Sequence, residues 1–176
     1  MSIQNFLNKY EIGFFIVLLI LVTSCATPIK PKISPVKPGM IPEYSFNQSV
    51  RVVNVQNTET VRIKDTLWEV NLKETTDVAV ELIKKELSKR GFQIQDNANK
   101  ILEIIISDVR VGLAHVGIFA VNKCTMVLKV RPGNGYFKYY QEYNHGLLPT
   151  NCDFTITKTV SAMLSDEDII NYLKND

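Results

Sequence analysis

Five side chains of the sequence carry thiol or imidazole chemistry: three cysteines and two histidines. His145 stands in EYNHGLLP beside Asn144 and close to Glu142, so it could act as a general base. A hydrolase also needs an activated nucleophile, and the chain contains no G-x-S-x-G motif. We therefore interpret His145 as an exposed loop residue and expect no enzyme activity, no catalytic residue and no cofactor.

Cys25 follows an apolar run that is typical of an export signal. Residues 12–22 read IGFFIVLLILV, eleven residues without a charge, after an N-terminal stretch that carries Lys9 and Glu11. A membrane-spanning helix needs about 20 apolar residues, whereas the apolar part of a signal peptide needs about 7–15 followed by small residues. The length of the run therefore favours a cleaved signal peptide, which would span residues 1–24, and not a membrane-spanning helix.

The stretch Val22-Thr23-Ser24-Cys25 resembles the bacterial lipobox. In lipoprotein precursors with this motif the cysteine thiol accepts a diacylglycerol, the signal peptidase cuts before it, and the new amine is acylated, for example with palmitate. By this resemblance Cys25 is the lipidation site. Ala26, which stands where an inner-membrane retention signal has Asp, implies the outer membrane on its periplasmic side. An ordinary cleaved signal and an uncleaved anchor are the alternatives.

Cys124 and Cys152 would then lie in an oxidising compartment, where disulfides persist. A bridge would close a loop of about 28 residues and stabilise the fold by about 3 kcal/mol. Two free thiols are the main alternative. A zinc site that adds His145 lacks a fourth ligand and a short C-x₂₋₄-C pair, so we expect no metal.

The segment after the lipobox is rich in proline. Residues 27–42 read TPIKPKISPVKPGMIP, with five prolines and three lysines. Because proline lacks an amide hydrogen and fixes φ, we expect an extended, solvated spacer. The chain thus divides into a signal peptide over 1–24, a lipidated cysteine and tether over 25–43, and a periplasmic domain over 44–176.

Composition narrows the class of partner. The chain is 45% hydrophobic and 22% charged, as in ordinary globular proteins. Its 20 basic and 18 acidic residues give a net charge of +2, which is too small to predict a nucleic-acid partner.

Hydrophobic periodicity predicts the order strand, helix, several antiparallel strands and helix. Residues 49–55, 100–111 and 121–131 alternate or are strongly apolar, as strands do, and residues 100–111 suit a central strand that is covered on both faces. A helix capped by Thr75 or Thr76 ends before Gly91, and two more helices cover residues 154–164 and the stretch after Ser165.

Asn134 and Gly135 predict a two-residue hairpin loop, which would pair Met126 with Tyr143 and Val130 with Tyr139. The element order then predicts an α+β fold, with an antiparallel sheet of about four to five strands and two or three helices on one face.

Several phrases resemble the YajG-like small lipoproteins of Gram-negative bacteria. They are ELIKKELSKRGFQI over Glu81 to Ile94, the strand ILEIIISDV, the hairpin pair, and the terminal helices with Leu164-Ser165-Asp166. The resemblance covers most of residues 50–173. It implies an α+β domain in a family that has no established enzymatic activity.

Two surfaces could make contacts. No acidic residue occurs between Asp108 and Glu142, whereas the basic residues Arg110, Lys123, Lys129, Arg131 and Lys138 accumulate there. Alternation puts Lys123, Lys129 and Arg131 on one sheet face, together with Tyr136, Lys138 and Tyr140. A solvated sheet face is the plainer interpretation.

The second surface is residues 112–120, GLAHVGIFA, with the apolar side chains Leu113, Val116 and Phe119. If this segment is a loop, these side chains form a contact site; if it extends the two neighbouring strands, which we favour, they belong to the core.

The sequence therefore predicts a non-enzymatic lipoprotein that is held on a membrane by its N-terminal lipid and binds another envelope protein or a second copy of itself. The alternative is a periplasmic carrier or chaperone for a lipid or glycan, which needs an apolar pocket between sheet and helices.

Overall fold

The computed structural model describes residues 27–64, 66, 68–116, 119–133 and 135–175, so Cys25 and the signal peptide lie outside the described residues. The elements follow in the order β1 (Thr27–Ile29), β2 (Ser49–Asn54), β3 (Thr60–Arg62), β4 (Trp68–Asn71), α2 (Leu72–Lys89), β5 (Gln93–Ile94), β6 (Lys100–Val116), β7 (Phe119–Pro132), β8 (Lys138–Gly146), α3 (Thr150–Leu164) and α4 (Glu167–Lys174).

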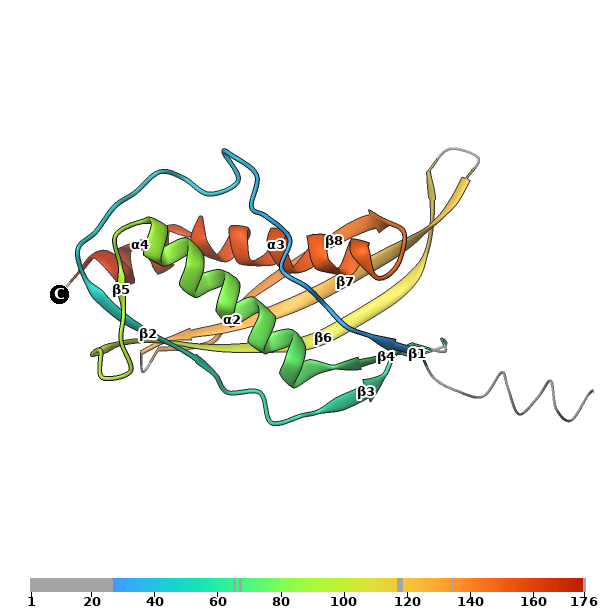
Figure 1. Ribbon diagram of the computed structural model, residues 1–176, viewed down its shortest axis with the longest axis horizontal. Helices are drawn as coiled ribbons and strands as arrows, with labels where there is room; N and C mark the ends of the chain where they lie inside the picture. Colours follow the sequence, from blue (N-terminus) through green and yellow to red (C-terminus); the bar gives the residue numbers. More distant parts are fainter. Residues whose placement is uncertain (1–26, 65, 67, 117–118, 134, 176) are drawn as a thin grey trace, which may run out of the picture.

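A five-stranded sheet in the order β5-β2-β6-β7-β8 forms the body, and a three-stranded sheet β1-β4-β3 lies at one end. Helices α2 and α3 cover one face of the larger sheet (Figure 1). The α+β class is confirmed. The sheet is mixed, however, because β2 runs parallel to both β5 and β6, so the expectation of a purely antiparallel sheet is wrong. The chain returns from β2 through α2, and such a crossover makes parallel neighbours.

The long strand β6 is buried on one face and open on the other. Leu102, Ile104 and Ile106 are fully buried under the helices, whereas Ile101 and Ile105 are half-buried on the opposite face. The pairing with β7 shifts between Ile106 and Asp108, which is a β-bulge. A bulge reverses the alternation after it. Val109 therefore joins the buried face, and the expectation of a strand covered on both faces is wrong.

Helix α2 begins earlier than its threonines predict. The Asn71 side chain accepts a hydrogen bond from the Glu74 amide at 3.0 Å, so Asn71 is the N-cap. Thr75 and Thr76 lie inside the helix, fully buried. The Thr76 hydroxyl accepts from the Ile106 amide at 3.0 Å, which ties the helix to the sheet at the bulge.

The hairpin β7–β8 differs from its expected register by one residue. Met126 pairs with Glu142 and Val130 with Lys138, so the connection spans residues 131–137. Gly133 has φ +55°, a left-handed conformation that suits an odd-length loop with glycine. Because alternate side chains point to opposite faces, the shift exchanges the two faces of β8.

The proline-rich segment packs against the domain in its described part. Ile29 and Ile41 are 2% and 4% exposed, and the Lys32 amide donates to the Asp153 carboxylate of α3 at 2.9 Å. The expected solvated spacer is therefore wrong for these residues. The isoleucines between the prolines gain burial, and the prolines have no amide hydrogen that needs a partner. Across the described residues, no helix has both the length and the apolarity to span a bilayer.

Candidate binding surface

The outer face is the surface of β7 and β8 that points away from α2 and α3. On β7, Cys124, Met126, Leu128 and Val130 are 0% exposed and point toward the helices. The residues between them point outward, and so do their partners on β8. The outer face consists of Lys123, Thr125, Val127, Lys129 and Arg131 on β7, Tyr139, Gln141, Tyr143 and His145 on β8, and Phe137 just before β8.

Cations and aromatic rings lie together on this face. The Lys123 Nζ lies 4.2 Å from the centre of the Tyr143 ring, and the Lys129 Nζ lies 5.2 Å from that of Tyr139. Tyr139 is 62% exposed and Tyr143 is 48% exposed. Exposed cation–π pairs stabilise by about 0.5–1 kcal/mol and hold the two side chains in place. The arrangement therefore presents ordered aromatic and cationic groups to solvent.

The net charge of this side of the sheet is positive. Arg131 forms a salt bridge with Glu103, and Arg110 forms one with Asp108 at 2.6 Å. Within the described part of the chain, Lys123 and Lys129 have no carboxylate within salt-bridge distance. Two lysines are thus left to meet an anionic partner, and they sit beside the exposed tyrosines.

Lys138, predicted to share this face, lies on the other side of β8. Its Nζ bonds Asp166 at 2.7 Å and Asp168 at 2.6 Å, both at the start of α4. The Tyr140 hydroxyl donates to Asp166 at 2.9 Å. The shifted register explains the difference, because it turns Lys138 and Tyr140 toward the helices. This cluster joins the sheet to α4, so Lys138 is not part of the outer face.

The same cluster shifts two pKa values. Burial raises the pKa of Asp166, but hydrogen bonds from Lys138 and Tyr140 and the charge of Lys138 outweigh it, so the pKa lies below its usual value. Burial lowers the pKa of Lys138, and its hydrogen bonds to Asp166 and Asp168 reverse that effect and raise it. Both groups are therefore charged at neutral pH, as a structural ion pair requires.

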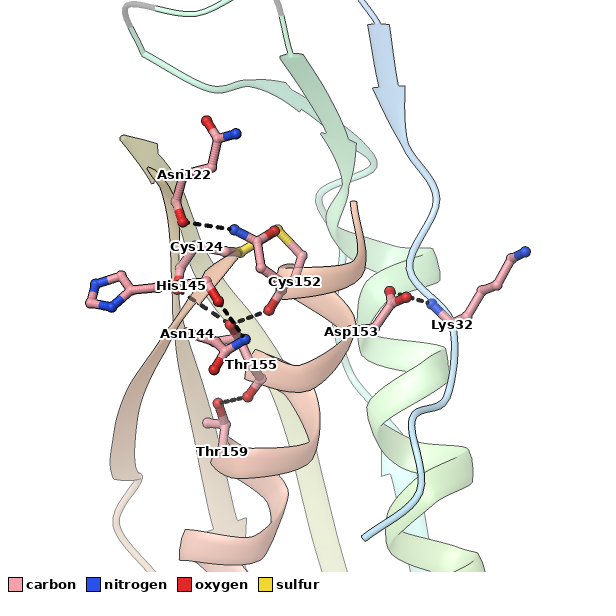
Figure 2. Close-up of a disulfide and its surroundings, with 10 residues drawn as sticks. Lys32, Asn122, Cys124, Asn144, His145, Cys152, Asp153, Thr155 and Thr159 are labelled. Atoms are coloured by element: carbon pink, nitrogen blue, oxygen red, sulfur yellow. Dashed lines mark hydrogen bonds between the residues drawn. A yellow bond between two sulfur atoms is a disulfide. The ribbon is translucent and has the colours of Figure 1, made fainter. Parts of the chain in front are cut away.

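The structure joins Cys124 and Cys152 in a disulfide, with their Cα atoms 5.3 Å apart. Both cysteines are fully buried, and the bond fastens the first turn of α3 to β7. Thr155 donates from its hydroxyl to the Cys124 carbonyl at 3.3 Å, which strengthens the same contact (Figure 2). The disulfide therefore supports the inner face of the sheet.

Neither histidine belongs to a cluster that could hold a metal. In Figure 2 the His145 ring points away from the disulfide, and its strand position is on the outer face opposite Lys123. His115 is exposed on β6. Among the described residues no group of three histidine, cysteine or acidic side chains could bind a metal ion. His145 lies in strand β8, so the prediction of a loop position is wrong.

Where the structure describes it, the segment over residues 112–120 extends strands β6 and β7, which is the interpretation that the sequence favours. Residues 112–116 of β6 pair with 119–123 of β7, and residues 117–118 lie outside the described residues. Leu113 is nevertheless 74% exposed, so strand pairing does not make it part of the core. The side chains of Val116 and Phe119 lie outside what the structure describes.

Sequence reasoning missed the tyrosines of the outer face. It placed Tyr140 there in place of Tyr139 and Tyr143, because the two-residue loop at Asn134 and Gly135 set the register. The signal that could have corrected it is the Pro132-Gly133 pair just before, since proline and glycine mark a longer turn.

No family model matches the chain, and neither does any curated protein. Several solved structures are similar to it, and two of them are described here. One is a minor lipoprotein from Acinetobacter baumannii, with 12% identity and a TM-score of 0.48 over 74% of this chain and 98% of that one. The other is a DUF330 protein from Xanthomonas campestris, with 9% identity and a TM-score of 0.38 over 84% of this chain and 93% of that one. At these values neither assigns the chain to a family, and the YajG-like resemblance stays a prediction.

Proposed function

We propose that this chain is a lipid-anchored protein of the bacterial cell envelope whose outer face binds an acidic surface of another envelope protein. It acts as a binding module and catalyses no reaction. The observation that carries the proposal is the pairing of Lys123 with Tyr143 and of Lys129 with Tyr139 on an open sheet face. Exposed tyrosines are enriched at protein interfaces, and lysines without carboxylate partners favour an anionic one.

The anchor in this proposal is Cys25. It stands three residues after Val22, at the end of an uncharged apolar run of signal-peptide length. Two or three acyl chains hold a protein stably on a bilayer, whereas one gives only marginal binding. The proposed location is the periplasmic side of the outer membrane, since Ala26 follows the cysteine.

Charge favours a different protein over a second copy as the partner. Two outer faces brought together would set Lys123 and Lys129 of one copy against the same cations of the other. Like charges that face each other across an interface cost several kcal/mol. An acidic protein surface meets the same groups without that cost.

The packing of the described core does not support the carrier hypothesis. A carrier pocket would lie between the sheet and the helices, where Leu82, Ile104 and Ile156 have 0–1% of their surface exposed. A side chain that lines a water-sized cavity keeps accessible surface. These three side chains have almost none, so α2, α3 and β6 pack closely at these positions and leave no cavity there.

The anchor is tested by Cys25→Ala in the producing bacterium. The variant should accumulate as unprocessed precursor and should not carry labelled palmitate, while the parent chain is processed and fractionates with the outer membrane. The matched control is Ser24→Ala, which keeps a small residue before the cysteine. Normal processing and retention of Cys25→Ala would contradict the anchor.

The binding role is tested by a photo-crosslinking residue at Gln141, which is exposed on the outer face between Tyr139 and Tyr143, in intact cells. We expect one discrete protein adduct, whose identification by mass spectrometry shows an acidic surface. An adduct of two copies of this chain would contradict the choice of partner. A lipid or glycan adduct would support the carrier in its place.

A further inference from the structure

The proline-rich segment sets how far the domain can stand from its proposed anchor. Strand β1 begins at Thr27, which pairs with Trp68 of β4. Only Ala26 lies between Cys25 and Thr27. A fully extended chain spans at most about 3.3–3.6 Å per residue, so two residue steps reach about 7 Å.

That reach is about the depth of one headgroup layer. A bilayer has a hydrocarbon core of about 30 Å and a total thickness of about 40–45 Å, which leaves about 5–8 Å of polar layer on each side. The residues that could have served as a spacer instead pack on the domain through Ile29 and Ile41. The end of the domain that holds Thr27 and Trp68 must therefore lie at the headgroups of the bilayer that holds the lipid.

A groove opens at this same end. The anchor-end groove lies between the loop after β3 and the paired strands β6 and β7 and is lined by Arg62, Ile63, Lys64, Thr66, Trp68, Val111, Gly112, Leu113 and Asn122. Figure 1 shows β1, β3 and β4 side by side, with the β6–β7 hairpin extending from the same end of the molecule.

The lining of the groove has the side chains of a membrane interface. Arg62 and Lys64 are exposed, and neither makes a salt bridge within the described residues. Leu113 is 74% exposed, and Trp68 is partly buried. No carboxylate is among the lining residues. Tryptophan favours the headgroup level, and arginine and lysine are attracted to anionic lipid.

We propose that the anchor-end groove lies on the bilayer surface and binds the phosphates of anionic phospholipid headgroups through Arg62 and Lys64, with Trp68 and Leu113 at the same level. The inference rests on the proposed lipidation of Cys25, which fixes this end at the membrane. It assigns a second contact to the protein: the groove meets the lipid, and the outer face stays available for the protein partner.

The test uses the full-length chain purified with its lipid and reconstituted into vesicles of phosphatidylethanolamine and phosphatidylglycerol. Trp68 is the only tryptophan of the chain, so its fluorescence reports on the groove alone. Quenching by a phospholipid with a nitroxide on its headgroup measures contact with the bilayer. Quenching by acrylamide measures access from water, and flotation of the vesicles measures anchoring.

We expect strong quenching of Trp68 by the nitroxide lipid and weak quenching by acrylamide. The variant R62E/K64E should still float, and its nitroxide quenching should fall by at least about half, because each cation favours contact with an anionic surface about fivefold. The matched control K84E/K85E, with the same charge change on α2, should behave like the parent chain.

Two results would overturn the proposal, and they differ from each other. A chain that floats but whose Trp68 is quenched by acrylamide and not by the nitroxide lipid is anchored with this end turned away. A chain that does not float has no lipid anchor, which contradicts the proposed function and removes the basis of this inference.

Discussion

The hairpin of β7 and β8 has one face that is buried under the helices and one face that is open to solvent. On the inner face, Leu128 and Val130 are 0% exposed beneath the helices, and Cys124 is bonded to α3. On the outer face, Lys129 and Tyr139 occupy the neighbouring positions, where Lys129 is half-buried and Tyr139 is 62% exposed. Burial of apolar area supplies most of the free energy of folding, so the inner face holds the fold together. The outer face contributes little to folding and is therefore free to carry the contacts proposed for it.

The sharpest contrast is between two adjacent residues of β7. Leu128→Ala should lower the free energy of unfolding by about 3–5 kcal/mol, because it leaves a cavity in a fully buried site. Val127→Ala, one position along and on the outer face, should cost less than about 1 kcal/mol. Urea unfolding followed by circular dichroism measures both. Equal losses would show that the two faces do not differ as described.

Removal of the disulfide should have the next largest effect. The double substitution C124A/C152A should lower the free energy of unfolding by about 3 kcal/mol, because it releases a closed loop in the unfolded chain. Urea unfolding with and without reductant measures the loss, and reductant should destabilise the parent chain but not the variant. A parent chain that is insensitive to reductant would contradict a stabilising bond.

The ion-pair cluster at α4 should give a smaller, pH-dependent effect. Because the pKa of Asp166 is lower in the folded chain, its contribution to stability is complete above the unfolded pKa of about 3.9. That contribution is lost as the pH falls below this value toward the folded pKa. Asp166→Asn should cost about 1.5 kcal/mol at neutral pH.

The difference in free energy of unfolding between the parent chain and Asp166→Asn should shrink when urea unfolding is repeated below about pH 3.5. Lys138→Met tests the partner side of the pair and should show the same loss near neutral pH. A difference that stays constant from neutral to acidic pH would mean that the Asp166 charge does not stabilise the fold.

The smallest effect on stability is expected on the outer face. Tyr139→Ser should change the free energy of unfolding by less than about 0.5–1 kcal/mol, which is the size of an exposed cation–π pair. Urea unfolding measures it beside Leu128→Ala. A loss as large as that of Leu128→Ala would show that Tyr139 serves the fold and not a surface.

The α+β class followed from the sequence because strands and helices differ in period. Helix α2 buries the face that its hydrophobic spacing predicts. Strand β6 does so as well from Lys100 to Ile106, where the bulge begins. Periodicity has no signal for that bulge, since Ser107 is an ordinary strand residue in the sequence. Strict alternation would put Val109 on the same face as Ile101 and Ile105, whereas the bulge turns it to the buried face.

The candidate surface was predicted in part. Lys123, Lys129 and Arg131 share a face because alternation within one strand fixes them, whereas Lys138 does not join them because its side depends on the register. The anchor-end groove joins β3, β4 and β6, which are distant in the sequence. Local pattern cannot predict such a contact, because long-range packing decides it.

The central claim is that the outer face binds through its cations and not through its part in the fold. It is tested most directly by a photo-crosslinking residue at Gln141 of the outer face in intact cells, compared between the parent background and K123E/K129E. We predict that the protein adduct falls at least about tenfold in K123E/K129E, as expected when two charges meet an acidic partner. The free energy of unfolding should fall by no more than about 1–2 kcal/mol, which is the size of the two cation–π pairs that are lost. The same crosslinker at Lys85 on α2 should give no such adduct. An adduct of equal yield in both backgrounds, or an equal one from Lys85, would contradict the account.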